Sequence, residues 1–256
     1  MAITIRPITT YADYIAAEGL QMVAFGYEPI EVVPYVQLQS FSRAGGAVIG
    51  AFDGATMVGV VFGYTGLRPD GTAYHRSQRM AVSPDYRRQG IGAALKYAQA
   101  DVARSYVLRL MCWTYDPLRA LNAHLNLHKL SAHAASYLEN LYQSHMGERD
   151  TGASIDRLWV EWDLTSARHP LEEIDRSSCD TVVKNIEALP SEPDLNSSAP
   201  VIVIQIPDDY EAIQAAGQER LRKWRLATRA AFIHYLGRGY SVADFKRGLG
   251  YILMRP

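Results

Sequence analysis

The sequence contains few cysteines, no long apolar segment and almost no net charge. Cys112 and Cys179 are its only cysteines, too few for a disulfide framework or a cysteine-based zinc site. No run of about 18 apolar residues is present, so the sequence predicts no membrane-spanning helix. Its 26 Lys and Arg residues nearly balance 27 Asp and Glu residues, so overall charge favours neither nucleic acid nor a membrane as a partner. The first ten residues also lack a signal-peptide pattern, and we expect a cytoplasmic location.

Strands and helices are predicted to alternate along the first 165 residues. Hydrophobic residues make up 48% of the 256 residues, enough for one large core or two modest ones. Asp53-Gly54 stands between two β-rich runs, which is typical of a tight hairpin. The other predicted strands cover 2–6, 74–82, 107–113, 134–141 and 158–164, and the predicted helices cover 11–25, 29–42, 90–104 and 118–130. This order indicates an α/β fold.

The segment MAVSPDYRRQGIGAAL (80–95) joins a predicted strand to a predicted helix. The strand ends at Val82 and the helix begins at Gly90, so the first free N–H groups of the helix lie at the loop. These donors and the positive end of the helix dipole can bind a phosphate or pyrophosphate. Gly90 and Gly92 let the backbone come close to such an anion, because neither carries a Cβ atom. The loop is therefore a candidate anion-binding site.

Two familiar phosphate-binding loops do not fit this segment. A dinucleotide fingerprint needs a third Gly or Ala at the place of Leu95. A Walker loop needs Gly-Lys-Ser or Gly-Lys-Thr, which the sequence lacks. An ordinary glycine-rich turn remains the alternative to an anion site.

The pattern Arg87-x-x-Gly90-x-Gly92, preceded by Met80-x-Val82-x-Pro84-x-Tyr86, resembles the coenzyme A pyrophosphate loop of the GNAT superfamily of acyl-CoA-dependent N-acyltransferases. The resemblance covers about residues 1–165 and implies a mixed central sheet flanked by helices. It also implies that loop amides bind pyrophosphate, that the strand backbone pairs with the pantetheine arm, and that parallel strands 74–82 and 107–113 splay apart to admit the thioester. The implied cofactor-binding residues are Met80, Ala81, Val82, Arg87, Arg88, Gln89, Gly90, Ile91, Gly92 and Ala93. The implied cosubstrate is acetyl-CoA or another acyl-CoA, and no metal is expected.

A narrower resemblance rests on WTYDPLRALNAHLNLHKLSA (113–132) and DRLWVEWDL (156–164). These segments are similar to a group of larger GNAT-like proteins with a carboxy-terminal extension, some of them linked with N-succinyl amino acid metabolism. The resemblance implies transfer of an acetyl or succinyl-type group to the amine of a small molecule such as an amino acid. Two departures favour the alternative of a non-catalytic acyl-CoA-binding protein. Leu127 stands where the superfamily often has a proton-donating Tyr, and Arg76 stands where it often has a carboxylate.

The candidate catalytic residues are Arg76, Gln78, Asn122 and Asn126. Asn122 and Asn126 lie one turn apart on the 118–130 helix, where the superfamily often contacts its cofactor; solvated polar residues are the alternative. Simple alternation along 74–82 places Arg76 and Gln78 on one face with Met80 and Val82, and His75 and Ser77 on the other with Arg79 and Ala81.

One of the two arginines, Arg76 or Arg79, is therefore expected near the reacting groups. Arginine cannot act as a base, but it can bind a carboxylate on the acyl group or on the acceptor. The alternative is that both side chains face solvent or pair with acids. The proton would then leave through a water held by His75, Ser77 or Gln78.

Other reactive residue types have a plainer interpretation. Cys112 stands in an apolar strand with no His near it in sequence, so we interpret it as a core thiol. His124 and His128 share a helical face and His133 follows, but no His-Glu-x-x-His motif is present, so a metal site is not favoured.

The carboxy-terminal region is predicted as a linker followed by a small ordered extension. The segment 166–200 is rich in Ser, Pro and acids, with one strand at 181–186, and separates the 1–165 domain from residues 201–256. Asp208 and Glu211 form a capping box for a long helix. A strand at 201–207, that helix, a short helix at 242–246 and a strand at 251–254 make a β-α-α-β unit, interpreted as a degenerate half-repeat.

The long helix carries five cations and one acid between 219 and 229. The cations are Arg220, Arg222, Lys223, Arg225 and Arg229. A solvated face is one interpretation, and an anion-binding patch for a cofactor phosphate, a substrate or nucleic acid is another. Because net charge is near zero, we regard a nucleic-acid partner as the weaker hypothesis. We expect 201–256 to pack on the first domain or on a second subunit of a homodimer.

Overall fold

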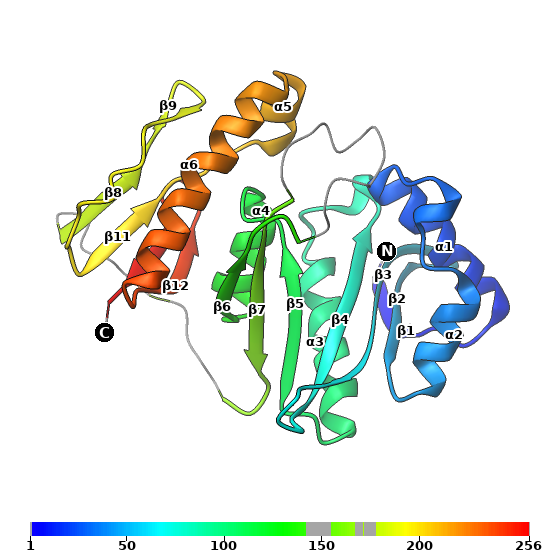
Figure 1. Ribbon diagram of the computed structural model, residues 1–256. Coiled ribbons are helices and arrows are strands. Elements are labelled where there is room, and N and C mark those ends of the chain that lie inside the picture. Colours follow the sequence, from blue (N-terminus) through cyan, green and yellow to red (C-terminus); the bar gives the residue numbers. More distant parts are fainter. Residues whose placement is uncertain (1, 142–154, 167–170, 172–177, 256) are drawn as a thin grey trace. The chain divides into compact units, whose positions relative to one another are not determined.

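The computed structural model describes residues 2–141, 155–166, 171 and 178–255 (Figure 1). The chain divides into two compact units. Unit 1 comprises Met1–Trp113 and Asp163–Ala167, and unit 2 comprises Thr114–Trp162 and Arg168–Pro256. This division differs from the predicted domains, because the segment 114–162 belongs with the carboxy-terminal extension and not with the first 113 residues. Within the described residues, no helix is long and apolar enough to cross a membrane.

Unit 1 contains a mixed sheet. Its strands are, in spatial order, β1 (Ile3–Pro7), β2 (Ala47–Asp53), β3 (Thr56–Leu67), β4 (Ala73–Val82) and β5 (Leu110–Tyr115), of which Leu110–Trp113 belong to this unit. Strands β1 to β4 are antiparallel neighbours, whereas β4 and β5 run parallel. The predicted hairpin is confirmed: Asp53 pairs with Thr56, and Gly54 has a φ of 59° that favours glycine.

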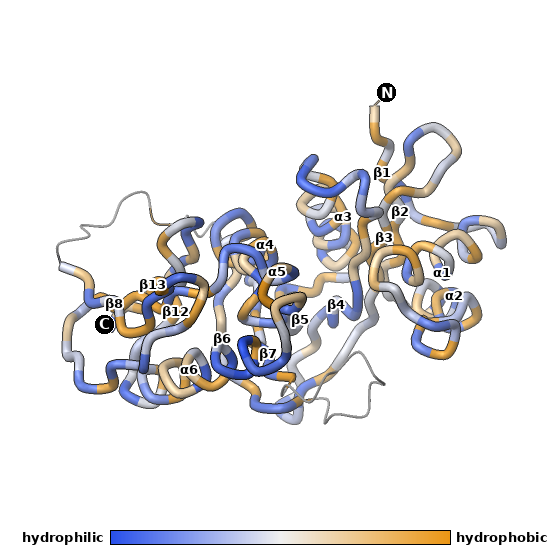
Figure 2. The backbone as a smooth tube through the Cα atoms, turned by 90° about the horizontal axis from the view of Figure 1, so that it is seen from above, coloured by the Kyte–Doolittle hydropathy of each residue, from blue (hydrophilic) through white to orange (hydrophobic). Residues whose placement is uncertain are grey.

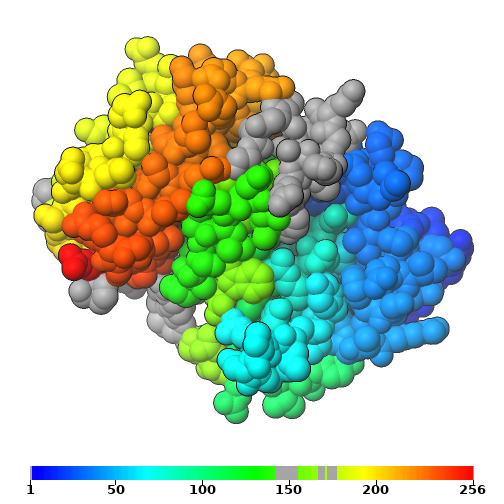
Figure 3. Space-filling model, in the orientation of Figure 1, coloured from blue at the N-terminus to red at the C-terminus, as the bar shows by residue number. Residues whose placement is uncertain are grey.

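Helices cover both faces of this sheet (Figure 2). The helices of unit 1 are α1 (Tyr11–Phe25), the short η1 (Pro29–Glu31), α2 (Tyr35–Arg43) and α3 (Ile91–Ser105). Helix α1 has the predicted bounds, because Thr10 accepts a hydrogen bond from the Asp13 amide at 3.1 Å and Gly26 ends the helix with a φ of 64°. In Figure 3 the blue atoms, which include those of α1 and α2, form part of the surface of this unit on the side shown.

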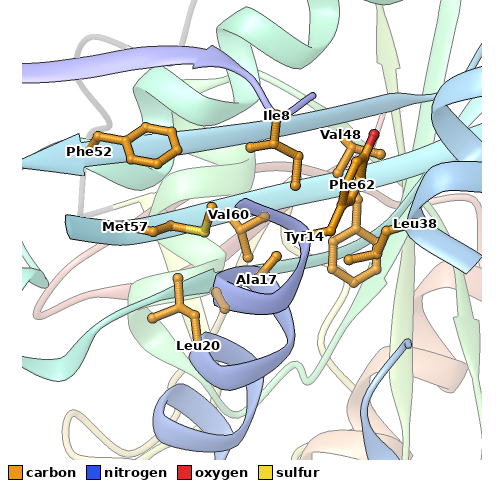
Figure 4. Packing of buried hydrophobic residues seen from close by; sticks show 11 residues of the cluster. Ile8, Tyr14, Ala17, Leu20, Leu38, Val48, Phe52, Met57, Val60 and Phe62 are labelled. Carbon is orange, nitrogen blue, oxygen red and sulfur yellow. The ribbon is translucent and has the colours of Figure 1, made fainter. Parts of the chain in front are cut away.

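Two hydrophobic clusters hold the helices to the sheet. One cluster packs α1 and α2 on the first four strands, with Tyr14 and Leu20 of α1 facing Val60 and Phe62 of β3 (Figure 4). The other packs Ile91 and Leu95 of α3 on the opposite face. Burial of each of these large side chains contributes roughly 1.5–3 kcal/mol before entropy is counted. The sheet with helices on both faces confirms the predicted α/β architecture.

A β-bulge at Gln78 corrects the predicted faces of β4. The register with β3 shifts here, because Phe62 pairs with Arg79 and the next residue, Gly63, pairs with Ser77. A Cβ atom at Gly63 would lie only 2.2 Å from the Arg76 carbonyl oxygen, so the bulge needs glycine opposite it.

Alternation is reset at this bulge, and the predicted faces are therefore wrong. Ser77, Met80 and Val82 face α3, as their contacts with α3 residues show. Arg79 and Ala81 face α1, since Arg79 bonds Gln21 and Ala81 lies in the α1 cluster. Arg76 shares a face with Arg79, because their cross-strand partners Tyr64 and Phe62 both pack on Phe41 of α2.

Unit 2 contains its own sheet and helices. Its strand order is β7 (Arg157–Asp163), β6 (His133–Leu138), β12 (Ser241–Lys246), β13 (Gly250–Met254), β11 (Val201–Ile204) and β8 (Cys179–Val183), with β8 and β11 parallel. Two short strands, β9 (Asn185–Ile186) and β10 (Leu189–Pro190), pair separately. The helices are α4 (Ala120–Ala123), which continues as the π-helical η3 (His124–Lys129), α5 (Tyr210–Ala215) and α6 (Gln218–Gly237).

Three predictions for the carboxy-terminal region are wrong. The expected helix at 242–246 is strand β12, and the expected long helix is split into α5 and α6 at Gly217, whose φ is 109°. Asp209, not Asp208, caps α5 by accepting from the Ala212 amide at 3.0 Å. The predicted linker also contains ordered strands, β8 to β10.

The predicted half-repeat can be compared with the order and the pairing of the elements. The elements β11-α5-α6-β12-β13 follow the same order of strand, helices and two strands as the start of the chain. Their pairing differs, because β1 pairs with β2 whereas β11 pairs with β13. The order alone therefore does not establish a repeat.

Candidate functional site

Strands β4 and β5 of unit 1 form a fork. Their register pairs are His75 with Met111 and Arg76 with Cys112, at the start of both strands. Strand β4 continues to Val82, fully paired with β3 on its other edge. In the described structure, the β4 backbone from Ser77 onward therefore faces β5 without a ladder. Such an open edge offers N–H and C=O groups to an extended ligand.

The segment after β4 leads directly to the amino terminus of α3. Its short helix η2 (Pro84–Tyr86) is anchored by the Ser83 amide, which donates to the Val58 carbonyl at 2.9 Å, and by the Tyr86 hydroxyl, which donates to Asp53 at 2.9 Å. Arg88 has a φ of 65° and Gly90 a φ of 83°, so the chain turns sharply before the helix. The loop is thus fixed at its base, while residues 87–90 are exposed.

The amino terminus of α3 has the properties of an anion site. Gly90 is the N-cap, no side chain caps the helix, and its first turn contains no acid. The first intrahelical bond is from Ala94 to the Gly90 carbonyl, at 3.1 Å, so the amides of Ile91, Gly92 and Ala93 have no intrahelical acceptor. Uncapped donors at the positive end of a 15-residue helix suit a phosphate group.

The predicted loop residues differ in what their side chains can do. Ile91 is buried in the core under α3, so only its backbone can meet a ligand. Arg87 donates from Nη2 to the Ala24 carbonyl at 2.7 Å and from Nε to the Val82 carbonyl at 3.4 Å, so it ties the loop to the end of α1. Gln89 bonds the Asp85 carbonyl within the loop, whereas Arg88 is exposed. Arg88 is thus the better placed of the two arginines for a ligand phosphate.

A buried polar group lies at the vertex of the fork. Lys96 of α3 donates from Nζ to the Ser77 hydroxyl at 2.7 Å and lies 3.7 Å above the centroid of the Trp113 ring. Ser77 and Trp113 are the residues that follow the last paired positions of β4 and β5. Ser77 in turn donates to Gln99 at 2.7 Å. Burial, and then the charge of Arg76, lowers the pKa of Lys96 well below its ordinary value of 10.5.

His75 lies in the same region, and its buried environment favours the neutral imidazole. Its side chain is buried, and burial followed by the charge of Lys96 lowers its pKa from 6.5 to about 4. Its Nε2 atom has no hydrogen-bond partner among the described residues. Sequence analysis gave His75 and Ser77 a role in a water relay. Both instead face α3, and only Gln78, at the bulge, is exposed.

Sequence analysis missed Lys96 and Gln99. Both occupy buried positions on α3, next to Leu95 and Ala100. The signal was present, because a Lys and a Gln on the apolar stripe of a helix are unusual in a core and indicate a polar partner.

The two predicted asparagines belong to unit 2. Asn122 lies in α4 and is half-buried, whereas Asn126 lies in η3 and is buried next to Leu127. The π-helical turn widens the spacing there, with the Leu130 amide donating to the Leu125 carbonyl at 2.9 Å. The structure thus brings together the loop, the fork and Arg76 in unit 1, and the asparagines in unit 2.

Three other residues that were considered from the sequence, His128, Arg225 and Arg229, have structural partners in unit 2. His128 bonds the buried Asp244 of β12 at 3.0 Å and stacks on His124. Arg225 of α6 donates to both carboxylate oxygens of the buried Asp116, and Arg229 does the same to Asp156. The basic run on α6 is therefore neither a fully solvated face nor an intact anion patch.

Comparison with known proteins relates part of the chain to one family. A family model described as Acetyltransferase (GNAT) domain matches residues 45–145, which include the fork, the loop and α3. A search of the curated proteins found no match.

Several solved structures share the fold. The yncA protein from Salmonella typhimurium, solved with its cofactor acetyl-CoA, aligns with a TM-score of 0.53 at 17% identity over 68% of this chain and 100% of its own. The ribosomal-protein-S18-alanine N-acetyltransferase from Escherichia coli gives 0.50 at 20% identity, over 67% and 100%. An acetyltransferase of the GNAT family from Streptococcus pneumoniae gives 0.50 at 16% identity, over 62% and 98%. About a third of this chain lies outside each alignment.

Proposed function

We propose that the chain transfers an acyl group from an acyl-CoA to the amine of a small molecule, since its residues 45–145 match a family model described as Acetyltransferase (GNAT) domain. The observation that carries the proposal is the uncapped amino terminus of α3, with Gly90 at its N-cap, placed directly after a strand whose edge opens into a fork. Acyl-CoA, when bound, supplies an acyl group activated as a thioester.

The residues at the loop have binding roles. The amides of Ile91, Gly92 and Ala93 would donate to pyrophosphate oxygens, and the exposed Arg88 would add a cation. The free edge of β4 from Ser77 to Val82 would pair with the amide groups of the pantetheine arm. Because backbone groups make most of this site, sequence can vary widely around the two glycines.

The residues at the fork position the reaction. An amide near Val82 can donate to the oxygen on which charge develops. Lys96, Ser77 and Gln99 form a chain of hydrogen bonds at the vertex, and Lys96 also lies over the Trp113 ring, so these contacts link α3 to both strands of the fork. Gln78 is exposed, but its amide can only hold a water by hydrogen bonds and cannot act as a base. We therefore expect the acceptor amine to reach the site neutral or to lose its proton to water.

The acyl group is of the acetyl or succinyl type, and the acceptor is a small amine such as an amino acid. The rival is a non-catalytic acyl-CoA-binding protein, which the same loop supports and which Leu127, in place of a proton-donating Tyr, favours. A nucleic-acid module is disfavoured, because Arg225 and Arg229 of α6 are engaged with buried carboxylates.

Thiol release separates the two main candidates. The purified chain is mixed with acetyl-CoA or succinyl-CoA and a panel of amines, and free thiol is followed with time. Amine-dependent release supports the transferase. Binding of coenzyme A by calorimetry without amine-dependent release supports the binding protein, and failure to bind coenzyme A rejects both.

A further inference from the structure

Arg79 is a half-buried arginine without an acidic partner in the part of the chain that the structure describes. It lies on the face of β4 covered by α1, and the hydrogen bonds of its guanidinium are to a side-chain amide and a backbone carbonyl. Arg225 and Arg229, two arginines that are also shielded from solvent, each have a carboxylate within 3 Å. An arginine held away from bulk water without an anion is unusual and suggests that the anion comes from a ligand.

The guanidinium is fixed at one nitrogen only. Nη1 donates to Gln21 Oε1 at 2.8 Å and to the Glu31 carbonyl at 3.2 Å. Within the described structure, Nε and Nη2 have no hydrogen-bond acceptor. These two nitrogens form the edge of the guanidinium that fits both oxygens of a carboxylate.

The neighbours of Arg79 hold it in place. Gln21 is fully buried, and it also bonds the Val33 amide at 3.0 Å and the Val33 carbonyl at 3.1 Å. The rings of Tyr27 and Phe25 lie 4.9 Å and 5.9 Å from the guanidinium carbon. Aromatic faces stabilise the cation without neutralising it, so the charge stays available to a ligand.

We propose that Arg79 binds a carboxylate of the substrate through Nε and Nη2. The inference rests on the proposed acyl-transfer function and names the substrate class for that site: a carboxylate-bearing amine or a dicarboxylic acyl group. The bulge at Gln78 supports it, because it places Arg79 on the same face as Arg76, beside the end of α1 and the segment that follows it.

A purely structural role makes a different prediction. Arg79 would then only tie β4 to α1 and to the turn at Glu31, and its loss would lower stability without changing which substrates are preferred. Selectivity between matched substrates, measured beside stability, tells the two roles apart.

The experiment uses acceptor pairs in which one carboxylate is replaced by a carboxamide, and two donors of which one bears a carboxylate. Acceptors are alanine, methionine, phenylalanine and glutamate, each compared with its carboxamide at the α-position, and the donors are acetyl-CoA and succinyl-CoA. The parent, Arg79→Gln and Arg79→Lys are compared, with Arg43→Ala on the exposed end of α2 as the control. The parent should prefer the carboxylate member of at least one pair by about tenfold or more in kcat/KM. Arg79→Gln should abolish that preference, Arg79→Lys should restore only part of it, and Arg43→Ala should keep it.

A binding measurement supplies a readout that does not depend on turnover. N-acetylmethionine and N-acetylmethioninamide are titrated into the chain loaded with coenzyme A, and succinate is titrated separately. A preference seen among acceptors assigns the carboxylate to the amine, and one seen between donors assigns it to the acyl group.

Failure of this proposal is distinct from failure of the proposed function. Equal kcat/KM within every pair, or a preference that survives in Arg79→Gln, overturns the carboxylate role. So does a parent that binds coenzyme A but neither turns over nor binds any carboxylate member. Loss of coenzyme A binding in the parent would instead reject acyl-CoA as cosubstrate.

Discussion

Lys96 donates a hydrogen bond of 2.7 Å to Ser77, and no carboxylate accompanies it in the described structure. Because burial lowers the pKa of Lys96, the folded state favours the neutral amine, while the unfolded chain binds a proton up to about pH 10.5. Stability should therefore rise as pH is raised towards 10.5, while the unfolded lysine still binds its proton, and level off above that value.

Lys96→Met should remove this dependence. We expect the variant to be more stable than the parent at pH 7 and to unfold at a higher urea concentration. The hydrogen bond that Ser77 loses offsets part of this gain in free energy, by about 1 kcal/mol. The difference should shrink as pH approaches 10.5, the ordinary pKa of lysine. Urea unfolding at several pH values measures it. A variant less stable than the parent by the same amount at every pH would show that the lysine is charged and favourable where it lies.

His75 should make the fold sensitive to acid. Its pKa is lowered from 6.5 to about 4, so between these values the unfolded state binds more protons than the folded state. The free energy of unfolding should fall as pH drops through this range, by up to about 3 kcal/mol from this residue. His75→Asn should flatten the profile between pH 6.5 and 4. Parallel profiles for the two proteins would mean that the buried ring does not control acid stability.

Coenzyme A binding should depend more on the two glycines than on Arg87. Gly90 has a φ of 83°, so Gly90→Ala strains the turn by roughly 1 kcal/mol and disturbs the first amides of α3. Gly92→Val places a branched side chain beside those amides. Each variant should weaken binding by about tenfold or more in calorimetry.

Arg87→Ala is the matched control for the loop. Its guanidinium is bonded to the carbonyls of Ala24 and Val82, so we expect a loss of stability with little change in the dissociation constant. If Gly92→Val bound coenzyme A as tightly as the parent, the loop would not be the binding site.

The pair formed by Asp116 and Arg225 should dominate the electrostatics of unit 2. Burial alone would raise the pKa of Asp116, but the charge and hydrogen bonds of Arg225 outweigh it and lower the pKa. Arg225→Met leaves a buried carboxylate without its main partner and should cost about 3–5 kcal/mol. Adding Asp116→Asn should recover a large part of this loss, as a double-mutant cycle would measure.

The exposed pair of Arg222 and Glu219 gives the comparison. Their side chains are 58% and 66% exposed and lie 3.2 Å apart, so Arg222→Ala should cost no more than about 1 kcal/mol. Equal losses for Arg222→Ala and Arg225→Met would mean that the Asp116 pair is open to solvent.

Local sequence signals predicted most of unit 1. The Thr10 cap, the Asp53-Gly54 turn and the glycines before α3 act within a few residues, so the bounds of α1, the hairpin and the loop could be predicted from sequence. The candidate anion site follows from the same local features, because backbone amides at the start of α3 would form it.

Two of the errors share a physical cause, which is the β-bulge. Because of the bulge at Gln78, the predicted faces are wrong for half of β4. A register shift between Val242 and Asp244 interrupts the alternation in strand β12, so the segment was predicted as a helix. A bulge breaks the period of two on which strand prediction depends. The part of the candidate site that backbone groups would form could therefore be predicted from sequence. The part that depends on side-chain packing, at Lys96, was missed.

The bulge also gives β4 one residue more than the part of β3 with which it pairs. Nine residues of β3, from Gly59 to Leu67, lie opposite ten of β4, from Ala73 to Val82. Gln78 is the extra residue, so deleting it would make the two counts equal and leave the other pairs of the ladder in register. Arg76 and Arg79 would stay on the face covered by α1, and His75 and Ser77 on the face covered by α3, because their partners on β3 would not change. Loss of a second residue would instead turn one part of the strand over, so this strand should tolerate a deletion of one residue but not of two.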